Sequence, residues 1–336
     1  MGRVEIESLL NGDVRSLARA ISMIESREPG VGDLLEQIWE RRPGSAELSS
    51  QVVGVTGPPG SGKSTMADAL TQLWRDQGRR VAVLAVDPNS PFTGGAILGD
   101  RVRMQRHALD QGVFIRSMGA RGHLGGVSLA TRGAVRLLDA LGWEMVLVET
   151  VGVGQSELEI CEVADSVVVV TTPGAGDGVQ VIKAGITEIA DIFAVNKADL
   201  PGVDRVSRDL RDMLRLSIPK RGWKIPVVPT VAAQGVEGVS DLASAIAAHH
   251  LHLEASGELS ERLRRRFQEE VVELVGARAH AFASSLLAEG GKEMLPDDAR
   301  RADPERAAEM VLERFHNEGR GTGAEAPELS AASGRS

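Results

Sequence analysis

The segment Gly57-Pro58-Pro59-Gly60-Ser61-Gly62-Lys63-Ser64-Thr65 restricts the fold of this chain more than any other feature. It fits the pattern G-x-x-x-x-G-K-[ST], in which small residues let backbone N–H groups wrap around a phosphate. An apolar run precedes it and a helical pattern follows, so the loop leads from a strand into the positive end of a helix. We expect Lys63 to neutralise the β- and γ-phosphate oxygens and Ser64 to offer its hydroxyl to Mg²⁺.

Short apolar runs alternate with helical stretches after this point, which predicts a doubly wound α/β domain with a mostly parallel sheet. Seven candidate strands are Val52–Thr56, Val81–Asp87, Val113–Met118, Glu144–Thr150, Val167–Thr172, Ile192–Asn196 and Val227–Thr230. Helical patterns cover Lys63–Gln77, Val127–Leu141, Gly178–Gly185, Arg205–Leu216 and Gly238–His250. Ligands of such sheets bind at the carboxyl ends of the strands.

Helical segments flank the nucleotide-binding domain, which we place at residues 46–256. Residues 1–45 form an amino-terminal helical arm, a lid or docking arm. Residues 257–317 form a carboxyl-terminal helical dimerisation arm. Its apolar stripe, which includes Leu263 and Phe267, is expected to pack on its own domain or on a second subunit, with Arg262 on the polar face. Residues 318–336, rich in Gly, Ala, Ser and Glu, are predicted to be disordered.

The composition of the 336 residues excludes several classes of protein. The net charge of -9 argues against nonspecific binding to nucleic acid or to an anionic membrane. No uninterrupted apolar run reaches the ~18–20 residues that span a bilayer. The first ten residues lack the apolar region of a secretory signal. We therefore expect a cytoplasmic protein that binds neither nucleic acid nor membrane.

The sequence Asn196-Lys197-Ala198-Asp199 follows an apolar run and indicates a guanine site. Asp199 can accept hydrogen bonds from guanine N1–H and from the exocyclic amine. Adenine offers no such pair of donors, and a buried carboxylate left unpaired is costly. The ligands are thus expected to be GTP and GDP. The loop of Val231, Ala232 and Ala233 would complete the site, with the N–H of Ala232 on guanine O6.

Glu149 ends another strand, where an acidic residue is expected near Mg²⁺ and Ser64. Asp87 and Asp100, on the loop after the second strand, are candidates to complete the Mg²⁺ shell or to hold its waters. The alternative for the loop after Asp87 is a solvated surface loop. Lys63, Glu149 and Gln155 are the candidate catalytic residues. Val153 stands where small signalling GTPases carry the glutamine that orients the attacking water, and Gln155 lies two residues further on. This predicts slow intrinsic hydrolysis, accelerated by a partner or by rearrangement of a dimer.

Two more segments have alternative interpretations. Asp177 is expected to cap a helix that presents Gln180 and Lys183 on one face, either as a surface helix or as a nucleotide-sensing loop. The histidines at 249, 250 and 252 lie near a predicted helix end, either as imidazoles that interact favourably with the helix dipole or, as the alternative, as a metal site.

Taken together, five segments closely resemble one family of SIMIBI-class P-loop GTPases. They are G-P-P-G-S-G-K-S-T, D-P-N-S-P-F-T-G-G-A-I-L-G-D-R-V-R-M, E-T-V-G-V-G-Q-S-E, Q-V-I-K-A-G and N-K-A-D. The chain resembles the methylmalonyl-CoA mutase-associated GTPases of the MeaB/MMAA type, known earlier as arginine/ornithine transport kinases. The resemblance covers about residues 5–290 and is densest over residues 51–200.

The resemblance implies a GTP-hydrolysing chaperone that binds an adenosylcobalamin-dependent methylmalonyl-CoA mutase. Such proteins gate cofactor loading and protect or reactivate the enzyme, and they are homodimers with helical extensions. Their three switches would fall near Asp87–Arg101, Glu149–Leu158 and Gly174–Lys183, with Asp177, Gln180 and Lys183 as relay residues.

Two alternative functions require features that the sequence lacks. A metallochaperone GTPase for nickel enzymes would need cysteine or histidine ligands near the phosphate loop, and the sequence has none there. A kinase or ATPase acting on an amino-acid transport system would need a positioned acceptor and base, and neither can be identified.

Overall fold

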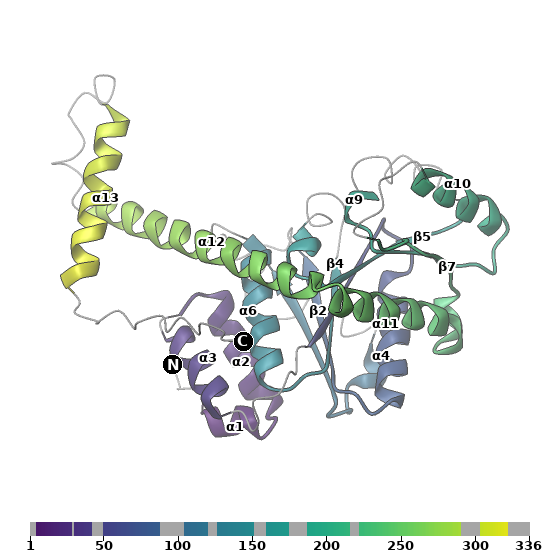
Figure 1. The fold of residues 1–336 in the computed structure, drawn as a ribbon. Helices are drawn as coiled ribbons and strands as arrows, with labels where there is room; N and C mark the ends of the chain where they lie inside the picture. The colour runs from purple at the N-terminus through teal and green to yellow at the C-terminus, as the bar shows by residue number, and fades with distance from the viewer. Residues whose placement is uncertain are drawn as a thin grey trace, which may run out of the picture. The chain divides into compact units, whose positions relative to one another are not determined.

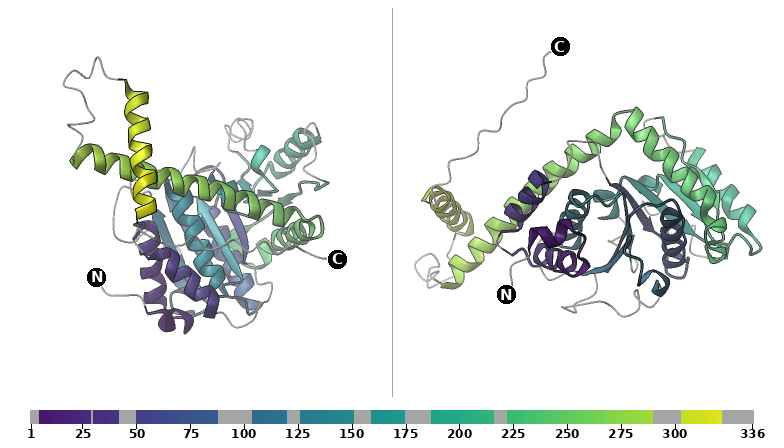
Figure 2. Two further views of the ribbon diagram at one scale, coloured as in Figure 1. Left: turned by 60° about the vertical axis from the view of Figure 1, so that its left-hand side comes forward. Right: turned by 90° about the horizontal axis from the view of Figure 1, so that it is seen from below.

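The computed structural model describes residues 5–28, 30–41, 50–87, 104–119, 126–150, 159–174, 187–215, 222–289 and 303–321. The chain divides into two compact units, residues 1–268 and residues 269–336. The first unit is built on a seven-stranded sheet with helices on both faces (Figures 1 and 2).

The sheet is parallel at each of its six strand pairings. Its strands are β1 (Gln51–Thr56), β2 (Val81–Asp87), β3 (Val113–Gly119), β4 (Met145–Thr150), β5 (Ser166–Thr171), β6 (Ile192–Val195) and β7 (Val227–Pro229). They lie in the order β3-β2-β4-β1-β5-β6-β7. The predicted doubly wound fold is confirmed, and each strand matches its predicted bounds to within a residue. Because β1 lies at the centre, the segment that follows it emerges from the middle of the sheet.

A separate hydrophobic core fills each face of the sheet. One core joins the strands to α1 (Ile6–Leu10), α2 (Val14–Glu25), α3 (Val31–Arg41), α6 (Gly126–Ala140) and α10 (Val203–Arg215). The other joins them to α4 (Lys63–Asp76) and α11 (Ser240–Ala255). Short helices are η1 (Gln105–His107), η2 (Ile160–Glu162), α9 (Thr187–Ile189), η4 (Ala232–Gln234) and η5 (Glu237–Val239). The helix predicted at 178–185 lies outside the described residues.

The amino-terminal helices are part of the first of these cores. Asp13 caps α2 by accepting a hydrogen bond from Ser16 N at 2.8 Å. The apolar stripe of α2, which includes the fully buried Ile21, packs in the same cluster as residues of α6. Arg116 of β3 donates to Glu25 at 2.6 Å and to Ala18 O at 2.9 Å. These helices therefore close the sheet face as an integral layer of the domain.

Two aspartates tie together the amino ends of the three strands β1, β5 and β6. Asp165, directly before β5, accepts from Val52 N at 2.9 Å. Asp191, directly before β6, accepts from Val167 N at 2.9 Å. Each carboxylate thus pairs with a backbone N–H of the neighbouring strand, at the sheet edge opposite the phosphate loop.

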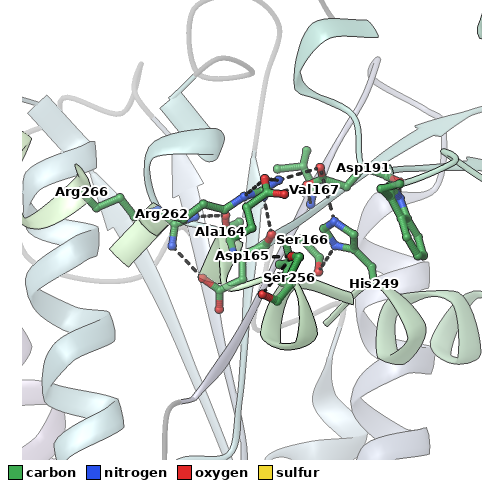
Figure 3. A network of polar contacts seen from close by, with 12 residues as sticks. Ala164, Asp165, Ser166, Val167, Asp191, His249, Ser256, Arg262 and Arg266 are labelled. Carbon is green, nitrogen blue, oxygen red and sulfur yellow. Dashed lines mark hydrogen bonds and ion pairs between the residues drawn. The ribbon is translucent and has the colours of Figure 1, made fainter. Parts of the chain in front are cut away.

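Two arginines at the start of α12 (Glu258–Glu289) neutralise these buried carboxylates (Figure 3). Arg266 donates to Asp165 Oδ1 at 2.7 Å, and Arg262 reaches both carboxylate oxygens of Asp191 at 3.4 Å. Arg262 also donates to the backbone oxygen of Asp165 at 2.8 Å. Arg262 was predicted on the polar face opposite the apolar stripe. That face contacts the sheet through Arg262 and Arg266, while Leu263 and Phe267 of the stripe are exposed.

The second unit contains the rest of α12 and helix α13 (Pro304–Gly321). Phe282 and Phe315 pack edge to face with ring centroids 5.2 Å apart. The prediction of disorder is wrong for residues 318–321, since α13 continues to Gly321. Residues 322–336 lie outside the described residues.

The helix stretch Glu258–Ala288 is long and apolar enough to cross a membrane, judged by length and composition alone. It departs from the expectation of no such segment because only the charged side chains of Glu273 and Arg278 interrupt its most apolar part. A helix of a soluble protein can satisfy the same test, so this finding is weak evidence for a membrane span.

Candidate nucleotide site

The phosphate loop leaves the central strand β1 and ends where α4 begins at Lys63. Gly57 has φ 141°, and a Cβ there would lie 2.1 Å from the carbonyl oxygen of Val170 in β5. Gly62 has φ 92°, and a Cβ there would lie 2.3 Å from Asn196 Nδ2. Both glycines are therefore required by backbone conformation and by close approach. Pro59 and Gly60 are exposed at the tip of the loop.

The side chains of Lys63 and Ser61 lie within the phosphate loop. The Lys63 ammonium donates to the backbone oxygens of Gly57 at 2.8 Å and Pro58 at 3.2 Å, so it lies across the loop. Ser61 Oγ is buried in the loop with no hydrogen-bond partner among the described residues. A row of backbone N–H groups, a lysine and a buried hydroxyl at a helix amino terminus suit an anionic phosphate. Thr65, the last residue of the pattern, has an exposed side chain.

Ser64 and Glu149 form the part of the predicted Mg²⁺ site that the structure describes. Ser64 Oγ donates to Glu149 Oε1 at 2.5 Å, which brings a hydroxyl and a carboxylate together beside the loop. Such oxygen donors, few in number and next to phosphates, match what Mg²⁺ takes in nucleotide sites. No cluster of three or more His, Cys, Asp or Glu that could hold a metal occurs within the described ranges.

Asn196 joins the phosphate loop to the predicted guanine loop. Its Nδ2 donates to Ser61 O at 2.8 Å, and its Oδ1 accepts from Ala232 N at 3.0 Å and from Thr230 Oγ1 at 3.4 Å. The N–H of Ala232 is engaged with Asn196 in this geometry, contrary to the prediction that it meets guanine O6. A backbone amide has one proton, so the backbone N–H of a neighbouring residue would have to contact guanine O6.

Lys197 and Asp199 follow at the carboxyl end of β6. Lys197 has φ 58° and its ammonium donates to Gly60 O at 2.9 Å. Asp199 is exposed beyond it. Two residues of the N-K-x-D segment thus bond to the phosphate loop, about 135 positions earlier in the chain. The structure therefore brings together the two segments that were predicted separately to bind phosphate and guanine.

Of the other predicted site residues, Val231 and Ala233 flank Ala232 in the described loop, and the rest have no described side chains. Asp87 is the last residue of β2, and nothing is described of its carboxylate. Asp100, Gln155, Asp177, Gln180 and Lys183 lie outside the described residues. Their proposed roles in the Mg²⁺ shell, in catalysis and in switching stay predictions.

Sequence reasoning placed His249 near a helix end and missed that it is buried at the opposite edge of the sheet. His249 Nδ1 lies 2.7 Å from Ser166 Oγ (Figure 3). Its ring packs on Trp223 with centroids 4.8 Å apart. Burial lowers the pKa of His249 to about 4, opposed by the negative charge of Asp191. The imidazole is therefore neutral near pH 7, and its 3.7 Å approach to Asp191 is a polar contact rather than an ion pair.

The family model of the methylmalonyl-CoA mutase-associated GTPase MeaB matches residues 17–285. This chain belongs to that family. The match covers the central sheet, the phosphate loop and the N-K-x-D segment that Asn196 joins to it. The GTPase family predicted from the five sequence segments is confirmed.

Individual relatives agree with the family match. A candidate GTPase of Pyrococcus horikoshii is 46% identical over 313 residues, which is 92% of this chain and 97% of the relative. The mitochondrial methylmalonic aciduria type A homolog of Mus musculus is 32% identical over 326 residues, 91% of this chain and 78% of the relative. A crystal structure of an LAO/AO transport system kinase matches with a TM-score of 0.63 and 27% identity, covering 93% of this chain and 96% of that one.

Proposed function

We propose that this chain hydrolyses GTP slowly and acts as a chaperone of an adenosylcobalamin-dependent methylmalonyl-CoA mutase. GTP is the proposed substrate and Mg²⁺ the proposed metal. The observation that supports the proposal most strongly is the bridge from Asn196 to Ser61 O, at 2.8 Å. It unites the candidate guanine segment with the phosphate loop, so one nucleotide can contact both.

The residues of this chain have distinct tasks in the proposed reaction. Backbone N–H groups of the phosphate loop and the Lys63 ammonium hold the β- and γ-phosphates, and Asp199 selects guanine. Ser64 and Glu149 would hold Mg²⁺, which when bound offsets the negative charge that develops on the phosphates. Catalysis of this kind depends mainly on positioning and electrostatics, with little covalent chemistry by the protein.

The chaperone role is proposed from the family to which the chain belongs. The family is named for its association with methylmalonyl-CoA mutase, and a relative is named after methylmalonic aciduria. We extend that association to this chain, with gating of cofactor loading, protection or reactivation as the task. We further propose that the protein is cytoplasmic and binds neither nucleic acid nor membrane, in keeping with its net charge of -9.

A homodimer is proposed from the exposed apolar side chains of α12. Leu263, Phe267, Val271 and Val275 recur at every fourth position and are 46%, 58%, 42% and 56% exposed. Side chains at this spacing lie near one another on a helix, and a second copy of the same helix offers a matching apolar face. Phe267→Asp should convert the dimer into a monomer in analytical ultracentrifugation. The control Arg264→Asp changes a neighbouring exposed position of the same helix.

The GTPase proposal is tested with the purified full chain, Mg²⁺ and either GTP or ATP. We expect phosphate release from GTP and none above background from ATP. Asp199→Asn should weaken GTP binding because an amide cannot accept both guanine hydrogen bonds, whereas Asp204→Asn on the exposed start of α10 should leave it unchanged. Equal hydrolysis of ATP and GTP would refute the proposed specificity. Transfer of label from nucleotide to a transport protein would favour a kinase instead.

The chaperone proposal is tested by co-purification with a methylmalonyl-CoA mutase. The tagged chain is incubated with the mutase and either GDP or a nonhydrolysable GTP analogue. A complex whose amount depends on the nucleotide supports the proposal. If no complex forms with any cobalamin-dependent acyl-CoA mutase, the chaperone role is refuted while the GTPase activity is unaffected.

A further inference from the structure

A buried pair of threonine hydroxyls links the ends of the strands β1 and β4. Thr150 Oγ1 donates to Thr56 Oγ1 at 3.0 Å, and both side chains are almost completely buried. Thr56 directly precedes Gly57, where the phosphate loop begins, and Thr150 directly follows Glu149. The pair therefore lies one residue away from two parts of the nucleotide site.

The hydroxyl bond extends the pairing of the two strands beyond their backbone ladder. The register of β1 with β4 runs from Gln51 opposite Met145 to Val55 opposite Glu149. Thr56 and Thr150 are the next residues, and their side chains hold the strands together where the backbone pairing stops. After this point the two strands lead into different segments, so the hydroxyl bond is the last link between them within the described residues.

A second polar contact lies one position earlier and on the opposite face of the sheet. Successive side chains of a strand point to opposite faces. Glu149 accordingly meets Ser64 on the face covered by α4, at 2.5 Å, while Thr150 meets Thr56 on the other face. The carboxyl end of β4 is thus attached to the phosphate-loop region on both faces of the sheet.

Stability alone gives no reason for hydroxyls at this position. Thr56 lies in register with Val169 of β5, and Thr150 with Val86 of β2, and both valines belong to the hydrophobic core of this face. With valine also at positions 56 and 150, the row across these four strands would consist of four valines and would fill nearly the same volume of the core. Replacing both members of a buried hydrogen-bonded pair by apolar groups of the same shape can be nearly neutral or stabilising. The hydrogen bond between the hydroxyls instead fixes the distance and the angle between the carboxyl ends of β1 and β4.

We propose that Thr56 and Thr150 are positioning residues for GTP hydrolysis. Their bond fixes the end of β4 against the start of the phosphate loop and thereby holds the Glu149 carboxylate beside Ser64. Glu149 precedes Thr150 directly, so rotation or slippage of the strand end displaces its carboxylate. A displacement of about 1 Å in a catalytic group can reduce a rate on the order of 10²-fold. This inference rests on the proposed GTPase activity.

The test compares the double variant Thr56→Val/Thr150→Val with the wild-type chain. We expect kcat for GTP to fall about tenfold or more, KM to change less than about twofold, and the Mg²⁺ concentration for half-maximal activity to rise, because the affected carboxylate is a proposed metal ligand. Thermal stability should be unchanged or higher. The single variant Thr150→Ser keeps a hydroxyl opposite Thr56 and should retain most of the wild-type activity.

Thr71→Val is the matched control for removal of a buried hydroxyl. Thr71 is fully buried in α4 and donates to Ala67 O at 2.7 Å within its own helix. Its loss should leave kcat and the Mg²⁺ dependence unchanged. The inference is overturned if the double variant hydrolyses GTP like the wild type, or if Thr71→Val lowers kcat equally. Absence of hydrolysis by the wild-type chain would instead refute the proposed function itself.

Discussion

The buried His249, at the amino ends of the strands, should make the folding stability depend on pH between its unfolded pKa of 6.5 and its folded pKa of about 4. Burial holds the pKa of His249 at about 4, compared with 6.5 in an exposed imidazole. The negative charges of Asp191 and Glu258 raise the pKa of His249, and the positive charge of Arg262 lowers it. Burial outweighs them all. The folded state therefore excludes a proton that the unfolded chain binds between about pH 6.5 and pH 4.

The sign and size of the effect follow from proton linkage. Because the unfolded state binds more protons in this window, the free energy of unfolding falls as the pH is lowered through it. Complete titration of His249 would lower the free energy of unfolding by about 3 kcal/mol. Lowering the pH from about 7 to about 5 would lower it by about 2 kcal/mol. The aspartates with lowered pKa values, Asp13 and Asp110, lose their contributions below their ordinary value of 3.8, which lies outside this window.

Urea unfolding at several pH values between 7 and 5 measures this slope. The variant His249→Asn keeps a polar atom near Ser166 and removes the titrating group, so its stability should change less with pH than that of the wild type. The loss of ring packing on Trp223 lowers its absolute stability, and only the slopes are compared. His280→Asn, at an exposed position of α12, should keep the wild-type slope. If the free energy of unfolding changes with pH by the same amount in the wild type and in His249→Asn, the predicted effect of His249 is refuted.

Two further predictions concern other buried contacts. Arg266→Met leaves the carboxylate of Asp165 buried without its 2.7 Å partner and should cost about 3–5 kcal/mol in urea unfolding, whereas the exposed neighbour Arg264→Met should cost almost nothing. Equal costs would show that the pair contributes no more than a surface charge. Gly57→Ala places a Cβ against Val170 O and should lower nucleotide affinity more than tenfold, by distorting the loop, as measured with fluorescent GDP. Unchanged affinity would mean that the loop adjusts without strain.

The sheet could be predicted from the sequence because its signals are local. A run such as Val167–Val170 is apolar throughout, and only a strand covered on both faces requires that pattern over so short a length. The phosphate loop was equally predictable, since its glycines, its lysine and its place between strand and helix are adjacent in the chain. The contact between Asn196 and Ser61 joins residues 135 positions apart, and the order of the strands determines it.

The polar network at the other edge of the sheet was not predicted, because each of its members has an ordinary local interpretation. An aspartate before a strand is typical of a turn, and arginines on an amphipathic helix are typical of its solvated face. The contacts of Arg262 with Asp165 and Arg266 with Asp165 span about 100 positions. One signal was present: the dipeptide Ala-Asp precedes two apolar strands, at 164–165 and at 190–191.

The ion pairs of Arg262 and Arg266 limit where the chain can be truncated without loss of folding. A fragment that ended at residue 256, the predicted end of the nucleotide domain, would keep Asp165 and Asp191 in the interior and discard the cations that balance them. A fragment that retains the start of α12 through Arg266 keeps every contact of the two carboxylates described above. The smallest piece of this protein that folds by itself should therefore include the first turns of the helix that follows the domain.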